Sequence, residues 1–344
     1  MAESARAGDP GPEAAGGWRA ELLLRFARAE DGVTRMVGRR HTGPLVVQRA
    51  FYPEPPEPPE PREPPQSPGV SAVPHVYVLH PPGGLVGGDR LRLEVTAEQA
   101  AHALLTTPAA TKVYRSAGPP ASQELRFEVA AGATLEWLPQ ETILHDGTHA
   151  RLTTMVRLEE GAAFIGLETL CFGLPARGET FATGRCRQGF EIWRQGHPLF
   201  VERGRFDATD DVHTAAWGLA GARVNGFMVM VPGLVGGMVG PPARRTVSPT
   251  APLTAPQYVE GQDSNAADRE RDRVALLSRL RVVAAEVDLP GRAGVTTVSD
   301  GQVWVCRYVG PSAERARLLF QRLWTLARPV LLGRAAVAPR IWAT

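Results

Sequence analysis

His-Pro-Pro-Gly-Gly-Leu-Val-Gly-Gly-Asp-Arg-Leu, at residues 80–91, is the stretch that says most about the fold of this chain. Its four glycines and two prolines exclude a regular strand or helix, because proline lacks a backbone N–H and glycine adopts either sign of φ. Residues 76–79 and 91–95, on either side, have the pattern of strands. We therefore expect a shaped loop between two strands. Its loop-shaping residues are predicted to be Gly83, Gly84, Gly87, Gly88 and Asp89.

Two phosphate-binding motifs resemble this loop, and the sequence excludes both. A P-loop needs Lys followed by Ser or Thr after its last glycine, whereas Gly88 precedes Asp89 and Arg90. A dinucleotide-binding fingerprint needs a helix next, but residues 90–96 have the alternation of a strand. An acidic residue in the loop would also repel phosphate.

Short strands separated by turn signals dominate residues 75–205. Turns containing glycine or proline recur about every ten residues, which favours an all-β sandwich or solenoid over alternating strands and helices. The residues alone do not decide between those two. The predicted strands are 18–26, 44–51, 76–79, 91–95, 103–106, 124–129, 134–137, 151–158, 162–169, 180–186, 188–193, 223–231 and 303–309.

Two helices are predicted near the C-terminal end. Apolar residues have helical spacing over residues 268–285, and a second helix starts at Pro311-Ser312 and is expected to stop at Pro329. We expect the apolar stripe of the second helix to be core. Its members are Ala316, Leu319, Phe320, Leu323, Trp324 and Ala327.

Composition indicates a globular protein whose main partner is not nucleic acid. The chain has 344 residues, 43% of them hydrophobic and 22% charged, and a formal net charge of only +2. Lys112 is its only lysine. Three scattered cysteines predict neither a disulfide framework nor a metal site, and no stretch has the roughly twenty apolar residues of a membrane helix. We expect a soluble, cytoplasmic protein.

The predicted domain organisation is simple. Residues 1–17 are expected to be a disordered tail and residues 18–344 a single β domain. Within that domain we expect a Pro/Glu-rich loop insertion at 53–69 and a flexible loop at about 243–266.

Five carboxylates are candidates for chemistry, because each lies in or beside a motif rich in glycine, proline or strand residues. Two of them could serve as the acid and base of a β-solenoid carbohydrate-active enzyme, which needs carboxylates about 5 to 10 Å apart. Alternatively, they bind backbone N–H groups in the turns of a purely structural β protein. The five are Asp89, Glu141, Asp146, Glu168 and Glu179.

Several ordered motifs resemble the urease accessory protein D family, known as UreD or UreH. They are Pro-Pro-Gly-Gly-Leu-Val-Gly-Gly-Asp at 81–89, Thr-Thr-Pro-Ala-Ala-Thr-Lys-Val-Tyr-Arg at 106–115 and Leu-Pro-Gln-Glu-Thr-Ile at 138–143. Gly-Glu at 178–179 and Pro-Arg-Ile-Trp-Ala-Thr at 339–344 continue the resemblance, which covers nearly the whole chain from Trp18 onward.

The resemblance implies a large, mainly β, mostly antiparallel, solenoid-like fold with a few helices, and a non-enzymatic role. Family members resemble scaffolds that assemble with the helical protein UreF and the GTPase UreG on apo-urease. They help to deliver nickel, as a transported ion and not a permanent cofactor, through a water-filled polar passage. The resemblance implies no nucleic-acid or membrane partner, and it allows a dimer within the accessory complex.

The resemblance also assigns site residues. Glu141, Glu168 and Glu179 match polar positions near the passage, and Asp146 joins them as a candidate for transient nickel binding. Oxygen donors suit this role because they bind divalent nickel weakly and release it. The chain departs from the family at His145, where an aromatic residue is usual, and at Leu174, where arginine is usual.

Overall fold

The computed structural model describes residues 17–54, 73–233, 264–286 and 291–343. Residues 1–16 of the predicted tail lie outside these ranges, as do residues 55–69 of the predicted insertion and 243–263 of the predicted loop.

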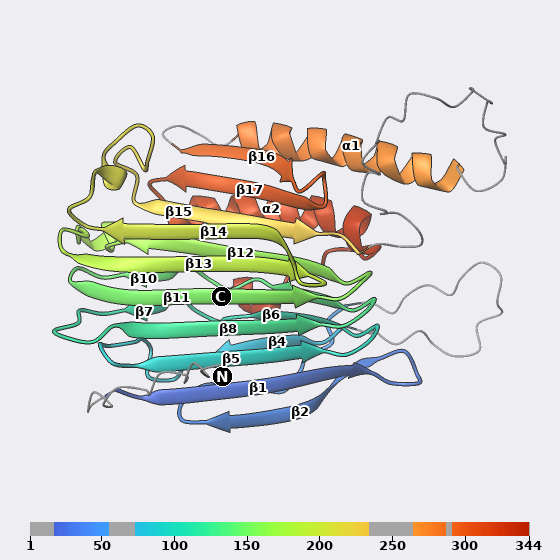
Figure 1. The fold of residues 1–344 in the computed structure, drawn as a ribbon, viewed down its shortest axis with the longest axis horizontal. Helices are drawn as coiled ribbons and strands as arrows, with labels where there is room; N and C mark the ends of the chain where they lie inside the picture. Colours follow the sequence, from blue (N-terminus) through green and yellow to red (C-terminus); the bar gives the residue numbers. More distant parts are fainter. Residues whose placement is uncertain (1–16, 55–72, 234–263, 287–290, 344) are drawn as a thin grey trace, which may run out of the picture.

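The chain winds back and forth between two β-sheets that face each other (Figure 1). From β4 to β13, the long strands fall alternately in one sheet and the other. The seven-stranded sheet has the order β14 (His197–Asp207), β13 (Gly184–Arg194), β11 (Thr148–Leu158), β8 (Ala121–Val129), β5 (Arg90–Ala97), β1 (Arg19–Arg28) and β2 (Thr34–Thr42). The ten-stranded sheet has the order β16 (Arg292–Val298), β17 (Val303–Gly310), β15 (Val224–Val231), β12 (Ala163–Phe172), β9 (Thr134–Trp137), β6 (His102–Thr106), β4 (His75–Leu79) and β3 (Val46–Val47). Off this order, β10 (Thr142–Leu144) pairs with β12, and β7 (Thr111–Val113) pairs with β10.

The prediction of a mainly β, solenoid-like fold with two helices near the C-terminal end is confirmed. Strand direction needs a correction, because mostly antiparallel pairing is found only towards the ends of the sheets. The centre is parallel, from β1 through β5, β8 and β11 to β13, and from β4 through β6 and β9 to β12. Winding returns the chain to the same sheet in the same direction, and this makes neighbouring strands parallel.

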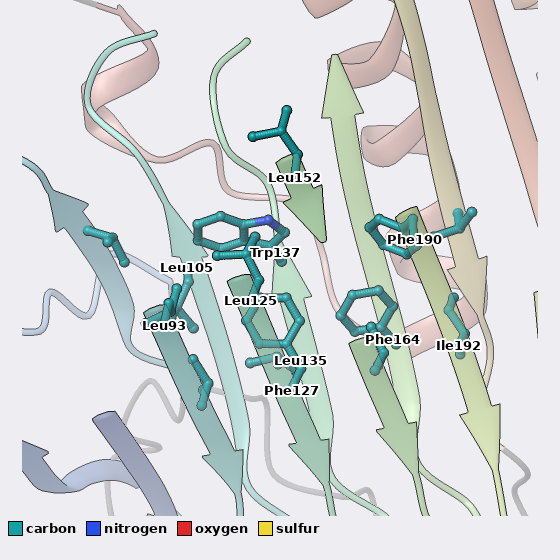
Figure 2. Close-up of a cluster of buried hydrophobic side chains, with 14 of the residues drawn as sticks. Leu93, Leu105, Leu125, Phe127, Leu135, Trp137, Leu152, Phe164, Phe190 and Ile192 are labelled. Carbon is teal, nitrogen blue, oxygen red and sulfur yellow. The ribbon is translucent and has the colours of Figure 1, made fainter. Parts of the chain in front are cut away.

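Apolar side chains from both sheets meet in one core between them (Figure 2). Alternation along each strand decides which side chains enter it, as in β5, where every second residue is buried. Phe127 of one sheet packs against Trp137 and Phe164 of the other, with ring centroids 5.6 and 6.1 Å apart. Aromatic pairs of this kind stabilise the core beyond the area that they bury.

Helices α1 (Ser264–Ala285) and α2 (Ala313–Leu332) accompany the ten-stranded sheet, and α2 packs on β12, β15 and β17 (Figure 1). All six residues of the predicted α2 stripe are buried. The prediction that Pro329 ends this helix is wrong, since the last turn continues to Gly333, which has φ +67°. Proline removes one hydrogen bond, but the helix still ends in a left-handed glycine. Short 3-10 helices occupy Pro175–Arg177, Asp211–His213 and Arg340–Ala343.

Two further sequence predictions can be compared with the structure. Cys171, Cys186 and Cys306 are all buried and free. Among the described helices, none has the length and apolar character needed to cross a membrane.

Candidate functional site

A cavity of about 220 Å³, lined by both apolar and polar side chains, lies between the two sheets. Inward-facing residues of β5, β8 and β11 form one wall, and residues of β4, β9 and β12 form the other. A carboxylate, an ammonium group, amides and hydroxyls line a space that would otherwise be apolar core. The polar lining includes Thr107, Lys112, Gln123, Gln140, Thr142 and Glu168.

Glu168 is the only carboxylate among the described residues that line this cavity. It lies on β12, and its Oε1 accepts a hydrogen bond from Gln188 Nε2 of the opposite sheet at 2.5 Å. Burial raises the pKa of Glu168 to about 7, the negative charge of Glu202 acts in the same direction, and the bond from Gln188 only partly offsets both. Near neutral pH this side chain therefore exchanges between its protonated and ionised forms.

The glycine-rich loop at residues 80–89 borders the same cavity through His80, Gly83 and Gly84. A Cβ on Gly84 would lie 2.4 Å from the ring of Tyr114, so only glycine allows this approach. Asp89 does not face the cavity. Its two carboxylate oxygens accept the N–H groups of Trp18 and Val86, both at 2.8 Å, and so tie the loop to the start of β1.

Asp146 and Glu179 lie together, but not on the cavity wall. Glu179 Oε1 accepts hydrogen bonds from His145 Nδ1 at 2.8 Å and from the N–H of Asp146 at 3.3 Å. Asp146 Oδ1 accepts from the N–H groups of Ala182 and Thr183, at 2.9 and 2.7 Å. These bonds lower the pKa of both carboxyls. The geometry is that of turn-stabilising carboxylates.

Glu141 is adjacent to the cavity lining without belonging to it. Gln140 and Thr142, on either side in the sequence, both line the cavity. Burial and, secondarily, the charge of Glu141 raise the pKa of the Cys171 thiol to about 11, which keeps this cysteine protonated. The structure therefore places Glu168 on the cavity, Glu141 beside it, and Asp146 with Glu179 in a separate cluster.

A buried ionic network on the helix side of the ten-stranded sheet was not predicted from the sequence. Arg328 of α2 is completely buried, and its Nε contacts Glu136 Oε1 at 3.0 Å while its Nη2 contacts Glu54 Oε1 at 2.6 Å. His102 and Trp324 also bond to Glu136, both at 2.7 Å. The predicted insertion at 53–69 needs a correction at its start, because Glu54 is buried and bonded to the core.

This network holds its carboxylates ionised. Burial alone would raise the pKa of Glu136, but the charge of Arg328 and the bonds from His102 and Trp324 outweigh it and lower the pKa to about 2. Burial lowers the pKa of His102 despite its bond to Glu136. The sequence signal was Arg328 one turn beyond Trp324, on the buried face of α2.

Within the described part of the chain, no group of three or more His, Cys, Asp or Glu side chains is arranged to hold a metal ion. Apart from Asp89 in the glycine-rich loop and Glu141 beside the lining, the carboxylates described above lie in three places: one exchangeable carboxylate in a cavity, a turn cluster and a buried ionic network. The first of these alone combines space, polarity and a titratable group.

Comparison with known proteins gives a consistent result. The family model described as UreD urease accessory protein matches residues 19–343. The protein named urease accessory protein UreD from Dechloromonas aromatica is 39% identical over 333 residues, which are 97% of each chain. Proteins of the same name from Azoarcus sp. and Pseudomonas entomophila are 40% and 39% identical, over 95% and 97% of each chain.

Proposed function

Because the chain belongs to the UreD family of urease accessory proteins, we propose that it matures urease by passing nickel through the cavity between its two sheets. In this role it acts in the cytoplasm as a scaffold, together with UreF and UreG, on the urease apoprotein. Nickel is the cargo that it transports. A urease maturation role is what the family itself supports, and the passage is the finer proposal.

The observation that carries the proposal is Glu168 on the wall of this cavity, beside hydroxyl and amide side chains. An apolar core would expel a hydrated divalent ion, whereas hydroxyl, amide and carboxylate groups can replace part of its water shell. Glu168 would supply the one negative charge on this lining, and a pKa near 7 lets it lose its proton when the cation arrives. One carboxylate in a cavity of this kind binds an ion weakly, as transit requires.

The other candidate carboxylates fit supporting roles. Asp146 and Glu179 use their oxygens on backbone and histidine groups, so nickel would have to compete with those bonds. We keep them as transient contacts outside the cavity. Glu141 lies beside the lining and adds negative charge near it.

An enzymatic role is not supported. Family members are accessory proteins and not catalysts. Among the described lining residues, the cavity has one carboxylate and one aromatic ring, Trp137, whereas glycoside hydrolysis needs two facing carboxylates. The carbohydrate-active alternative therefore has no site in this cavity.

The test is urease activation in cells that lack their own family member. Without this chain we expect urease subunits to be made but to contain little nickel, and the wild-type chain should restore the metal. Two variants address the cavity: Glu168→Gln, which removes the titratable group, and Thr142→Phe, which projects a large apolar side chain into the space. Both should lower nickel per urease at equal accessory-protein abundance.

Glu128→Gln is the matched control, since it removes a carboxylate from the exposed outer face of β8. It should restore nickel fully. Full nickel content with both cavity variants, at normal abundance, would refute the passage while leaving the urease accessory role intact.

A further inference from the structure

The outer face of the seven-stranded sheet carries a row of arginines that crosses the strands. Arg19 of β1 is directly opposite Arg90 of β5, and Ser122 of β8 follows in the same register. Arg151 of β11 is opposite Ser122 and also opposite Arg187 of β13. Arg205 of β14 completes the row opposite Arg187. We call Arg19, Arg90, Arg151, Arg187 and Arg205 the arginine row; all five are exposed.

This row breaks the pairing rule that the rest of the same face obeys. Like charges directly opposite each other destabilise a sheet, and opposite charges stabilise it. Arg157 meets Glu128 on the neighbouring strand at 2.9 Å, and Arg203 of β14 meets Glu191 of β13 at 3.0 Å. The arginine row contains no carboxylate at all.

Three members have no partner among the described residues to offset this repulsion. The guanidinium groups of Arg90, Arg151 and Arg187 form no hydrogen bond or ion pair with any described residue. Arg205 has only a 4.0 Å contact with Asp210. Repulsion within the row lowers the stability of the fold. Sites that are destabilising in this way are expected to have a function.

The spacing of the row identifies the partner. Adjacent strands lie about 4.8 Å apart, so the row spans about 24 Å. On a helix, residues three or four apart are separated by about 4.5 to 6 Å along the axis, and they share one face. An extended strand repeats a face only every ~6.7 Å and loses register with the row.

We propose that the arginine row docks an acidic helix of a protein partner. The helix lies across the strands, and carboxylates at steps of three and four residues along about 16 residues meet the guanidinium groups, which bind carboxylates in bidentate pairs. The proposal goes beyond nickel transit, because it concerns the outer face of the sheet and needs no metal.

The test uses the full chain and a capped 18-residue helical peptide that carries glutamates along one face, measured by fluorescence anisotropy. Arg151→Gln with Arg187→Gln should weaken binding about tenfold or more, and added salt should weaken binding to the wild-type chain. The matched control is Arg39→Gln with Arg40→Gln, which removes two exposed charges from β2 and should leave binding unchanged.

The melting temperature is an independent measurement, because a misfolded variant would not melt at a higher temperature. Because the row is self-repulsive, the Arg151→Gln, Arg187→Gln variant should melt about 1 to 2 °C higher than the wild type while binding the peptide less well. A lower melting temperature would overturn the argument.

Equal binding of a peptide with the same glutamates spread around the helix, or with glutamates at every second position, would overturn the geometry. Tighter binding of a single-stranded oligonucleotide that competes with the peptide would assign the row to nucleic acid. The assay contains no metal, so none of these outcomes affects the proposed nickel passage.

Discussion

Glu136 and Glu168 are carboxylates on adjacent strands of the same sheet, and they face opposite sides of it. Glu136 of β9 faces the helices, where it meets Arg328, while Glu168 of β12 faces the cavity between the sheets. The surroundings move their pKa values in opposite directions, to about 2 for Glu136 and about 7 for Glu168. Both side chains are removed from bulk water, so partners and not burial decide the difference.

The comparison separates a structural site from an exchangeable one. Glu136 is bonded to an arginine, a histidine and a tryptophan, which leaves it no capacity for a ligand. Among the described residues, Glu168 has one hydrogen-bond partner, the neutral amide of Gln188, and open space beside it. Groups of one type whose environments push their pKa values apart commonly mark the assignment of roles in functional sites.

The largest expected effect lies on the helix side. Replacing Arg328 by Met leaves Glu54 and Glu136 buried without their cation, and breaking a buried ion pair in this way costs about 3 to 5 kcal/mol. Urea unfolding followed by circular dichroism should show that loss. Arg322→Met is the control on the same helix, because its pair with Glu286 is exposed and its loss should cost less than about 1 kcal/mol. Equal costs for both would mean that the network is not what holds α2 to the sheet.

Glu168→Gln should have a smaller effect that depends on pH. The folded-state pKa of about 7 exceeds the unfolded value of 4.5, so the protonated carboxyl favours folding below pH 4.5 and this contribution is lost as pH rises through 7. The glutamine variant does not ionise, so its stability does not fall in this way as pH rises. It should match the wild type near pH 4 and exceed it by up to roughly 3 kcal/mol at pH 8.

The pKa shift of Glu136 changes stability with pH in the opposite direction. Its lowered pKa contributes stability above pH 4.5, and this is lost as pH falls through about 2. Glu136 does not change its protonation between pH 5 and 8, so over that range the difference between the wild type and Glu168→Gln reports on Glu168. A constant difference between wild type and Glu168→Gln over that range would contradict the exchangeable carboxyl.

Trp342→Phe should have the smallest effect. Trp342 Nε1 donates a hydrogen bond to Thr106 Oγ1 at 3.1 Å, and its ring packs edge-on against Trp324, with centroids 5.5 Å apart. Phenylalanine retains an aromatic ring but cannot donate the bond, so we expect a loss of about 1 kcal/mol in thermal unfolding. Trp217→Phe, at a 77% exposed residue, should change nothing measurable. A loss above that of Arg328→Met would make the C-terminal segment, and not the ionic network, the main anchor on this side.

Much of the fold could be predicted from local pattern. Alternating apolar residues and glycine turns predicted the strands, and the α2 stripe predicted the helix face that packs on the sheet. The solenoid-like winding was expected only from the family resemblance. Strand direction could not be predicted this way, because alternation is the same in parallel and antiparallel pairs. Neither the hydrophobic period nor the turn residues indicate which strand pairs with which.

The site was less predictable, because its chemistry depends on partners far apart in sequence. Glu168 was singled out, but its raised pKa comes from burial between the sheets and from the charge of Glu202, and the hydrogen bond from Gln188 of the opposite sheet offsets only part of it. Glu54 and Arg328 are separated by 274 positions, and Glu54 begins a proline-rich segment that resembles a spacer. The sequence around a strand carboxylate looks the same whether its oxygens are fully hydrogen-bonded or free to bind a ligand.

The most direct test of the account is to locate nickel in crystals of this chain by anomalous scattering at the nickel absorption edge. At pH 8 the account predicts a peak beside the Glu168 carboxylate in the cavity between the sheets, and no peak there at pH 5.5 or in Glu168→Gln. Nickel found only on surface histidines, at either pH, would contradict it.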